Sequence, residues 1–210
     1  MKTTVVLKVG GSVLSPNEDN IFDYKAALAI KNSLMQISQQ YQFIVIVGGG
    51  QLAKKYQAIA KQFTTENHEI DWAGLSANNH NAVMTRVSFG KDAKEEVYTF
   101  QMIYGKEDIS FTETFLLAGA GEPGHSGDMD ALIMGLRAGS TTIISLKNVD
   151  GVYDSDPSEN PNARKFDKLS WGEYFGIIKV TEFTPKMALP VDPITSKLAQ
   201  EKNIKFIILD

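Results

Sequence analysis

Short apolar runs alternate with amphipathic stretches at the beginning of the chain. Residues 5–9 form a β-branched run that stops at Gly10-Gly11-Ser12, and residues 42–47 form a second run that stops at three glycines. Between these runs, the apolar residues of 24–41 recur at the spacing of one helix face, and the same spacing resumes near residue 51. The pattern predicts a strand, a glycine turn and a helix, followed by the same order again.

The rest of the chain continues this alternation less regularly. We expect helices over residues 70–88, 128–138, 169–175 and 193–202, strands over 95–102, 115–118, 141–146 and 205–209, and turns over 148–151 and 154–161. Alternating strands and helices favour an α/β fold, an open α/β/α sandwich with a mostly parallel central sheet. Because no linker rich in Pro, Gly or Ser interrupts the sequence, we expect residues 1–210 to form a single domain.

Composition excludes several classes of protein. Hydrophobic residues make up 43% of the chain, which is enough for a core, and the formal net charge of −4 offers no overall basic field for a nucleic-acid polymer. The absence of cysteine excludes disulfides and thiolate metal sites, and His68, His80 and His125 are too dispersed for a zinc centre. The first apolar run is too short for a signal peptide or a membrane span, so we expect a soluble, cytoplasmic protein.

Three glycine clusters each follow a predicted strand. They are Gly10-Gly11-Ser12, Gly48-Gly49-Gly50 and residues 119–127. In a parallel sheet these loops meet at the carboxyl edge, where glycine lets the backbone approach a phosphate and the next helix points its amides at the anion. One cluster is explained equally well as a tight turn, whereas three together favour a phosphate site. The standard P-loop and dinucleotide motifs are absent.

Charged residues adjoin these clusters. Lys8 lies within the first predicted strand, where an unpaired charge is costly to bury. Either it faces water from an edge strand, or its ammonium group lies over phosphates, where negative charge spreads during transfer. Asp128 and Asp130 open the helix after the third cluster. One explanation of each aspartate is a helix cap or a partner of the helix dipole. The other follows from the anion site beside it, where such a carboxylate would orient a lysine or contact Mg²⁺.

Five stretches of the chain, in this order, resemble the amino acid kinase superfamily, and within it the shorter, archaeal-type UMP kinases. They are residues 9–14, 45–56, 123–128, 147–157 and 191–194, and the pattern Asn-Val-Asp-Gly-Val-Tyr-x-x-Asp-Pro at 148–157 is highly specific. The resemblance runs over almost the whole chain. It implies the carbamate kinase-like fold of the superfamily and in-line phosphoryl transfer from ATP with Mg²⁺. It also implies a homo-oligomer, either a dimer or a hexamer.

The resemblance further implies roles for individual residues. Lys8 would stabilise the transferring group, and Asp128 would orient that lysine. The residues implied to bind ATP are Gly11, Ser12, Gly50, Lys54, Lys147, Asn148, Tyr153 and Asp156. The residues implied to bind the acceptor are Gly49, Asp71, Gly121, Glu122, Pro123, Gly124, His125, Ser126 and Gly127. No side chain is implied as a metal ligand.

Two positions depart from the UMP kinase pattern. Asn79 stands where these enzymes usually have an arginine near the acceptor phosphate, and Glu122 would repel a phosphate if it pointed inward. Our first hypothesis is ATP-dependent phosphorylation of UMP to UDP, a step of pyrimidine biosynthesis. Two alternatives stay open: a kinase of the same fold with another small phosphate or carboxylate as acceptor, and a non-catalytic protein that binds a nucleotide or oxyanion.

Overall fold

Five parallel strands form the central sheet of the protein. The computed structural model describes residues 2–179 and 189–210. The strand order is β3-β2-β1-β4-β7, with bounds β1 (Thr3–Val9), β2 (Tyr41–Val47), β3 (Phe115–Ala118), β4 (Thr142–Leu146) and β7 (Lys205–Leu209). The first strand of the chain therefore lies in the middle of the sheet, and the turn that follows it reaches the centre of the carboxyl edge.

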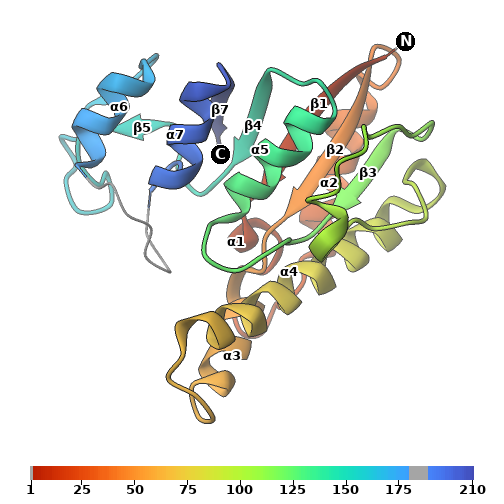
Figure 1. Ribbon diagram of the computed structural model, residues 1–210, viewed down its shortest axis with the longest axis horizontal. Coiled ribbons are helices and arrows are strands. Elements are labelled where there is room, and N and C mark those ends of the chain that lie inside the picture. The colour runs from red at the N-terminus through yellow and green to blue at the C-terminus, as the bar shows by residue number, and fades with distance from the viewer. Residues whose placement is uncertain (1, 180–188) are drawn as a thin grey trace.

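Helices cover both faces of this sheet (Figure 1). One face carries α2 (Tyr24–Met35) and α4 (Asn67–Phe89), and the other carries α5 (Gly127–Arg137) and α7 (Pro193–Glu201). The remaining elements are α1 (Gly11–Leu14), α3 (Gly50–Ala60), α6 (Trp171–Ile178), two 3-10 turns at Gly90–Asp92 and Phe100–Met102, and the antiparallel pair β5 (Val152–Tyr153) and β6 (Lys165–Phe166). The expected α/β/α sandwich is confirmed.

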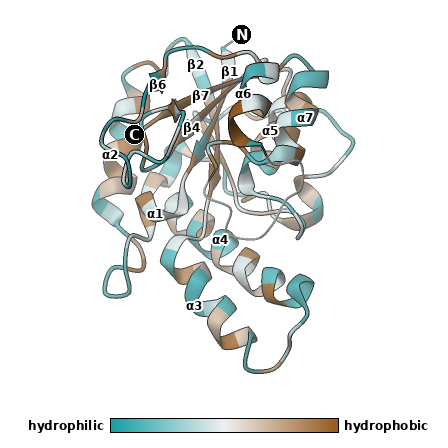
Figure 2. Cartoon of the chain, turned by 90° about the vertical axis from the view of Figure 1, so that its left-hand side faces the viewer, coloured by the Kyte–Doolittle hydropathy of each residue, from teal (hydrophilic) through white to brown (hydrophobic). Residues whose placement is uncertain are grey.

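Strand side chains alternate between two cores. In Figure 2 the brown segments of the strands lie between the helical layers. In β1, Leu7 and Val9 belong to the core beneath α2 and α4, whereas Val6 belongs to the core beneath α5 and α7. Lys8 shares the side of Val6, because successive side chains of a strand point to opposite faces. Strands pair with β1 on both sides, so the alternative of an edge strand with Lys8 in water is wrong.

The prediction of a strand over residues 95–102 is wrong. Within this segment Tyr98 makes an isolated bridge to Ala118, as Ala93 before it does to Phe115, and residues 100–102 form a 3-10 turn. At Phe100 the backbone has φ of 48°, which turns the chain away from the extended path of β3. The apolar residues of the segment therefore pack beside the sheet without continuing it.

Two helices differ in length from their prediction, and one β pair was missed. The helix expected over 24–41 ends at Met35, and the one expected over 70–88 runs from Asn67 to Phe89. The short strands β5 and β6 lie beside residues predicted only as turns. Among the described residues, no helix combines the length and the apolar character that a membrane crossing needs.

The turns after β1 and β2 pack backbone against backbone. A Cβ on Gly11 would lie 2.0 Å from the amide nitrogen of Gly50, and a Cβ on Gly48 would lie 2.6 Å from that of Gly11. Gly50 also has φ of 56°, in the left-handed region. These glycines are therefore required by the close approach of two turns, in addition to any part in binding a ligand.

Replacing Gly11 with alanine should destabilise the protein by roughly 1–3 kcal/mol, because the new methyl group overlaps the neighbouring turn. The matched control is Gly176→Ala in α6, where a Cβ meets no atom within 4 Å and alanine is the better helix former. Urea unfolding measures both variants. A Gly11→Ala protein as stable as the Gly176→Ala protein would contradict the contact.

Candidate active site

Lys8, Lys147 and Asp128 form a buried charge cluster at the carboxyl edge of the sheet. Lys8 comes from β1, Lys147 follows β4, and Asp128 lies in the first turn of α5. The ammonium nitrogens lie 3.7 Å (Lys8 to Oδ1) and 3.0 Å (Lys147 to Oδ2) from the carboxylate. The three side chains are 12%, 14% and 3% exposed. Because two cations share one anion, the cluster keeps one surplus positive charge.

Hydroxyl groups complete the surroundings of Asp128. Ser145 Oγ donates to Oδ1 over 3.2 Å, and Ser126 Oγ lies 3.3 Å from Oδ2. Ser126 caps α5 and also donates to Asp192, the cap of α7, over 2.6 Å. The N-termini of both helices are thus tied together beside the cluster. Neither Ser145 nor Asp192 was predicted as a site residue, although Asp192 followed by proline is a recognisable helix start.

Burial sets the protonation of this cluster. Burial lowers the pKa of Lys8 to about 8, and the Asp128 carboxylate opposes this shift only in part while the Lys147 charge adds to it. Burial alone would raise the pKa of Asp128, but the charges of Lys147 and Lys8 and their hydrogen bonds hold it below its ordinary value. Asp128 is therefore ionised near neutral pH, and the charge on Lys8 is the sensitive one.

A cavity of about 740 Å³ opens beside the two lysines, within the usual size for a small-molecule site. Among the residues that line it are Lys8, Gly11, Ser12, Lys147, Asn148, Tyr153 and Asp156. Ser12 Oγ donates to Asn148 Oδ1 over 2.9 Å, which joins the turns after β1 and β4. Most residues predicted for ATP are therefore brought together. Gly50 and Lys54 are outside this lining, and Lys54 is exposed on α3.

The loop predicted to hold the acceptor leads directly into the charge cluster. The amide of Gly124 donates to Asp71 on α4 over 2.9 Å, so the structure brings Asp71 to the loop. The side chain of Glu122 is exposed, while Pro123, His125, Ser126 and Gly127 are half-buried. A Cβ on Gly127 would lie 3.7 Å from Lys8 Cε. The end of the loop therefore adjoins the same lysine that lines the cavity.

Two asparagines of α4 connect the turns after β2 and β3. Asn81 Nδ2 donates to the carbonyl of Gly48 over 3.0 Å, and Asn79 Oδ1 accepts from the amide of Ala120 over 2.8 Å. Gly49 is buried against this helix, and a Cβ on it would lie 2.4 Å from Asn78 Oδ1. Asn79 thus holds the backbone of the acceptor loop and brings no charge. All three glycine turns lie at one edge of the sheet.

A second cavity lies away from the charge cluster, and the acidic residues form no metal site among the described residues. A cavity of about 790 Å³ lies between β7, α6 and the β5–β6 pair, and its lining does not include the charge cluster. Within residues 2–179 and 189–210, no group of three or more His, Asp or Glu side chains is placed to hold a metal ion. The oxygens of Asp128 already face Lys8, Lys147 and Ser145. This arrangement does not fit a metal cage built from protein ligands.

The chain is similar to known proteins in sequence and in fold. The model of the amino acid kinase family matches residues 3–108 and 110–210. A uridylate kinase of Methanococcoides burtonii is 32% identical over 207 residues, which is 98% of this chain and 86% of that protein, and one of Thermococcus kodakarensis is 32% identical over 98% of this chain and 89% of its own. The crystal structure of uridylate kinase from Archaeoglobus fulgidus is similar with a TM-score of 0.79 and 28% identity, covering 100% of this chain and 90% of that one.

Stability should rise with pH through the titration of Lys8. Folding lowers the pKa of Lys8 from 10.5 to about 8, so between these values the unfolded chain binds more protons than the folded protein. The penalty for the buried charge is complete below pH 8 and disappears toward pH 10.5; it amounts to about 3 kcal/mol. The gain in stability of Lys8→Met over the parent protein should therefore shrink as pH rises.

Urea unfolding across this pH range measures the difference, with Lys54→Met, at an exposed lysine, as the control. The curve of the control should run parallel to that of the parent protein. A Lys8→Met protein whose curve is also parallel would show that Lys8 is not buried as a charge.

Proposed function

The chain belongs to the amino acid kinase family, and we propose that it is a small-molecule kinase that transfers the γ-phosphoryl group of ATP to UMP, giving ADP and UDP. The observation that carries this proposal is the surplus positive charge of the Lys8–Asp128–Lys147 cluster. Lys8 lines the cavity of about 740 Å³ and adjoins the end of the acceptor loop. The γ-phosphate of ATP, coming from the cavity, and the phosphate of UMP, coming from the loop, would meet at Lys8.

The ATP phosphates would lie on the turn after β1, with the base in the cavity bounded by Asn148, Tyr153 and Asp156. The acceptor would lie along residues 121–127, near Asp71 and Gly49. An oxygen of the UMP phosphate then forms a bond to the γ-phosphorus while the bond from that phosphorus to the bridging oxygen of ADP breaks. Lys8 stabilises the charge that spreads over the transferring oxygens.

This reaction needs position and positive charge more than a base. The second pKa of a phosphate monoester is about 6, so the attacking oxygen is already an anion at neutral pH. Asp128 keeps both lysines oriented and does not have to accept a proton. Mg²⁺ would arrive with ATP, since it usually keeps several waters and is bound largely through substrate phosphates. No step of the proposal depends on a protein ligand to the metal.

A second candidate acceptor class is favoured by one observation. Asn79 is buried, uncharged and occupied with the loop backbone, so the cation that UMP kinases usually place there is missing. A smaller or less charged acceptor, such as a carboxylate, would need that cation less. We keep this alternative within the same reaction type, because Lys8, Asp128 and Lys147 serve either acceptor.

We also propose that the chain works as a homo-oligomer in the cytoplasm and that residues 1–210 form one domain. Apolar side chains at the protruding end of α3 support self-association: Ile59 is 54% exposed and Phe63, just after the helix, is 84% exposed. Burial of such a surface against a second copy is favourable. Light scattering during gel filtration measures the assembly.

Release of ADP should be fastest with UMP among a panel of other nucleoside monophosphates, small phosphates and small carboxylates. A coupled assay with ATP and Mg²⁺ measures this directly. Turnover of another acceptor with none of UMP would replace UMP and keep the kinase. The absence of turnover with every acceptor, together with tight ATP binding, would support the non-catalytic alternative.

Lys8→Met should lower kcat by roughly 10²–10³-fold while ATP binding persists, because it removes charge stabilisation that acts on the transferring group. Lys25→Met, at an exposed lysine of α2, is the control and should keep its activity, since Lys25 is outside the cavity lining. Steady-state kinetics and calorimetry measure the two effects. Unchanged turnover in Lys8→Met would remove the catalytic role proposed for this lysine.

A further inference from the structure

A second buried carboxylate holds the beginning of the acceptor loop. Asp130 is 1% exposed and lies two residues after Asp128 on α5. Its Oδ1 accepts a hydrogen bond from the amide of Gly121 over 3.2 Å. Burial raises the pKa of Asp130 to about 6, so the carboxylate is mainly ionised at neutral pH, and an ionised acceptor makes the stronger hydrogen bond. The phosphoryl transfer proposed above uses no atom of Asp130.

Tyr104 holds a later residue of the same loop. Its hydroxyl oxygen lies 2.5 Å from His125 Nε2 and 3.2 Å from Asp130 Oδ1. Burial, and then the charge of Asp130, raise the pKa of Tyr104 far above its ordinary value, so the phenol keeps its proton. Because a phenol can donate one hydrogen bond and accept another, it can bind the ring of His125 in either tautomer. The contact therefore does not depend on which ring nitrogen carries the proton.

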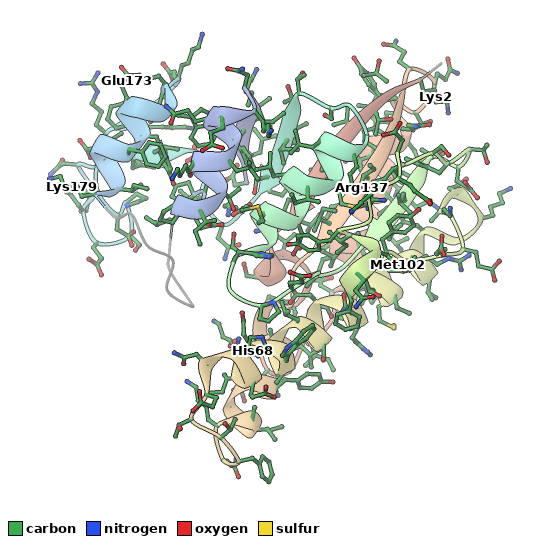
Figure 3. The ribbon with its side chains drawn as sticks, viewed as in Figure 1. Lys2, His68, Met102, Arg137, Glu173 and Lys179 are labelled. Carbon is green, nitrogen blue, oxygen red and sulfur yellow. The ribbon has the colours of Figure 1, made fainter. Side chains whose placement is uncertain are left out.

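The loop passes directly over the ring of Tyr104, whose own position is fixed. A Cβ on Gly121 would lie 2.1 Å from Tyr104 Cε2, so a side chain does not fit there. Arg137, at the end of α5, donates to the carbonyls of Met102 (2.5 Å) and Ile103 (2.7 Å), just before Tyr104. Figure 3 labels Arg137 and Met102. One helix thus carries Asp130 and also fixes the turn that carries Tyr104.

The middle of the acceptor loop has few other attachments. Within the part of the chain that the structure describes, three hydrogen bonds tie residues 121–125 to other elements: Gly121 to Asp130, Gly124 to Asp71 and His125 to Tyr104. Asp71 is also expected to bind the acceptor, so its bond to the loop competes with that role. Asp130 and Tyr104 are the two attachments that leave the acceptor free.

We propose that Asp130 and Tyr104 are positioning residues for the acceptor, because Asp130 fixes the loop at Gly121 and Tyr104 fixes it at His125. A loop that is already held in its binding conformation loses less conformational entropy when the acceptor binds, so affinity rises. Neither residue acts on the reacting atoms. The effect on the acceptor rests on the proposed function, whereas the order of the loop in the free protein does not.

Amide hydrogen exchange followed by NMR tests the order of the loop without any substrate. The amide of Ala120, beside Gly121, is held by Asn79 and serves as the reference within the same protein. Asp130→Ala should speed exchange at Gly121 about tenfold and leave Ala120 little changed. Asp130→Asn keeps an oxygen that can accept, and it should restore most of the protection. An unchanged rate at Gly121 in Asp130→Ala, or an equal rise at both amides, would overturn the proposal.

Kinetics test the effect on the acceptor. Tyr104→Phe removes only the hydroxyl group, and it should raise the KM for the acceptor about tenfold while kcat and the KM for ATP stay nearly unchanged. Asp130→Ala should act in the same way, and Asp130→Asn should recover most of the loss. Tyr24→Phe, at an exposed tyrosine of α2, is the matched control and should change none of these values.

The pattern of the kinetic changes separates positioning from general damage. An equal rise in both KM values, or a fall in kcat with an unchanged KM for the acceptor, would overturn the role. If Asp130→Ala does not fold, Tyr104→Phe decides the matter by the same criteria. If the parent protein phosphorylates no acceptor, the proposed function fails, while hydrogen exchange at Gly121 still decides whether Asp130 orders the loop.

Discussion

One buried carboxylate shared by two ammonium groups is the interaction on which the active site depends. Asp128 holds Lys8 and Lys147, and burying either lysine without a partner would be costly. One negative charge cannot neutralise both cations, so an anion is needed to complete the cluster. Burial, with the charge of Lys147 adding to it, lowers the pKa of Lys8 in the free protein. The missing negative charge explains why phosphate groups fit at the point where the cavity meets the acceptor loop.

The backbone is arranged so that the cluster can form. Close packing of Gly11 on Gly50 brings the turns after β1 and β2 together, and Asn79 and Asn81 connect them with the loop after β3. Ser126 joins the caps of α5 and α7 below the carboxylate. Two buried carboxylates of one helix then have separate partners. Asp128 binds the two lysines, and Asp130, two residues on, accepts from the amide of Gly121 in the acceptor loop and from Tyr104.

The sequence was informative where the chemistry is local. Short apolar runs predicted all five strands of the sheet. The wrong strand, 95–102, includes Phe100, whose positive φ depends on packing that no periodicity reveals. Lys8 could be singled out because its strand is otherwise apolar. Tyr104 could not, because it lies in an irregular segment and meets Asp130 only in the folded protein. Lys54 was assigned by resemblance, and its exposed position on α3 leaves that role a proposal.

The most direct test of the shared cluster is a crystal structure with a bisubstrate analogue in which adenosine and uridine are joined by a chain of phosphates. We expect the phosphates to pass between the cavity and residues 121–127, with the ammonium groups of Lys8 and Lys147 on the oxygens of the chain and Asp128 still bridging them. A phosphate chain bound away from these two lysines would contradict the account.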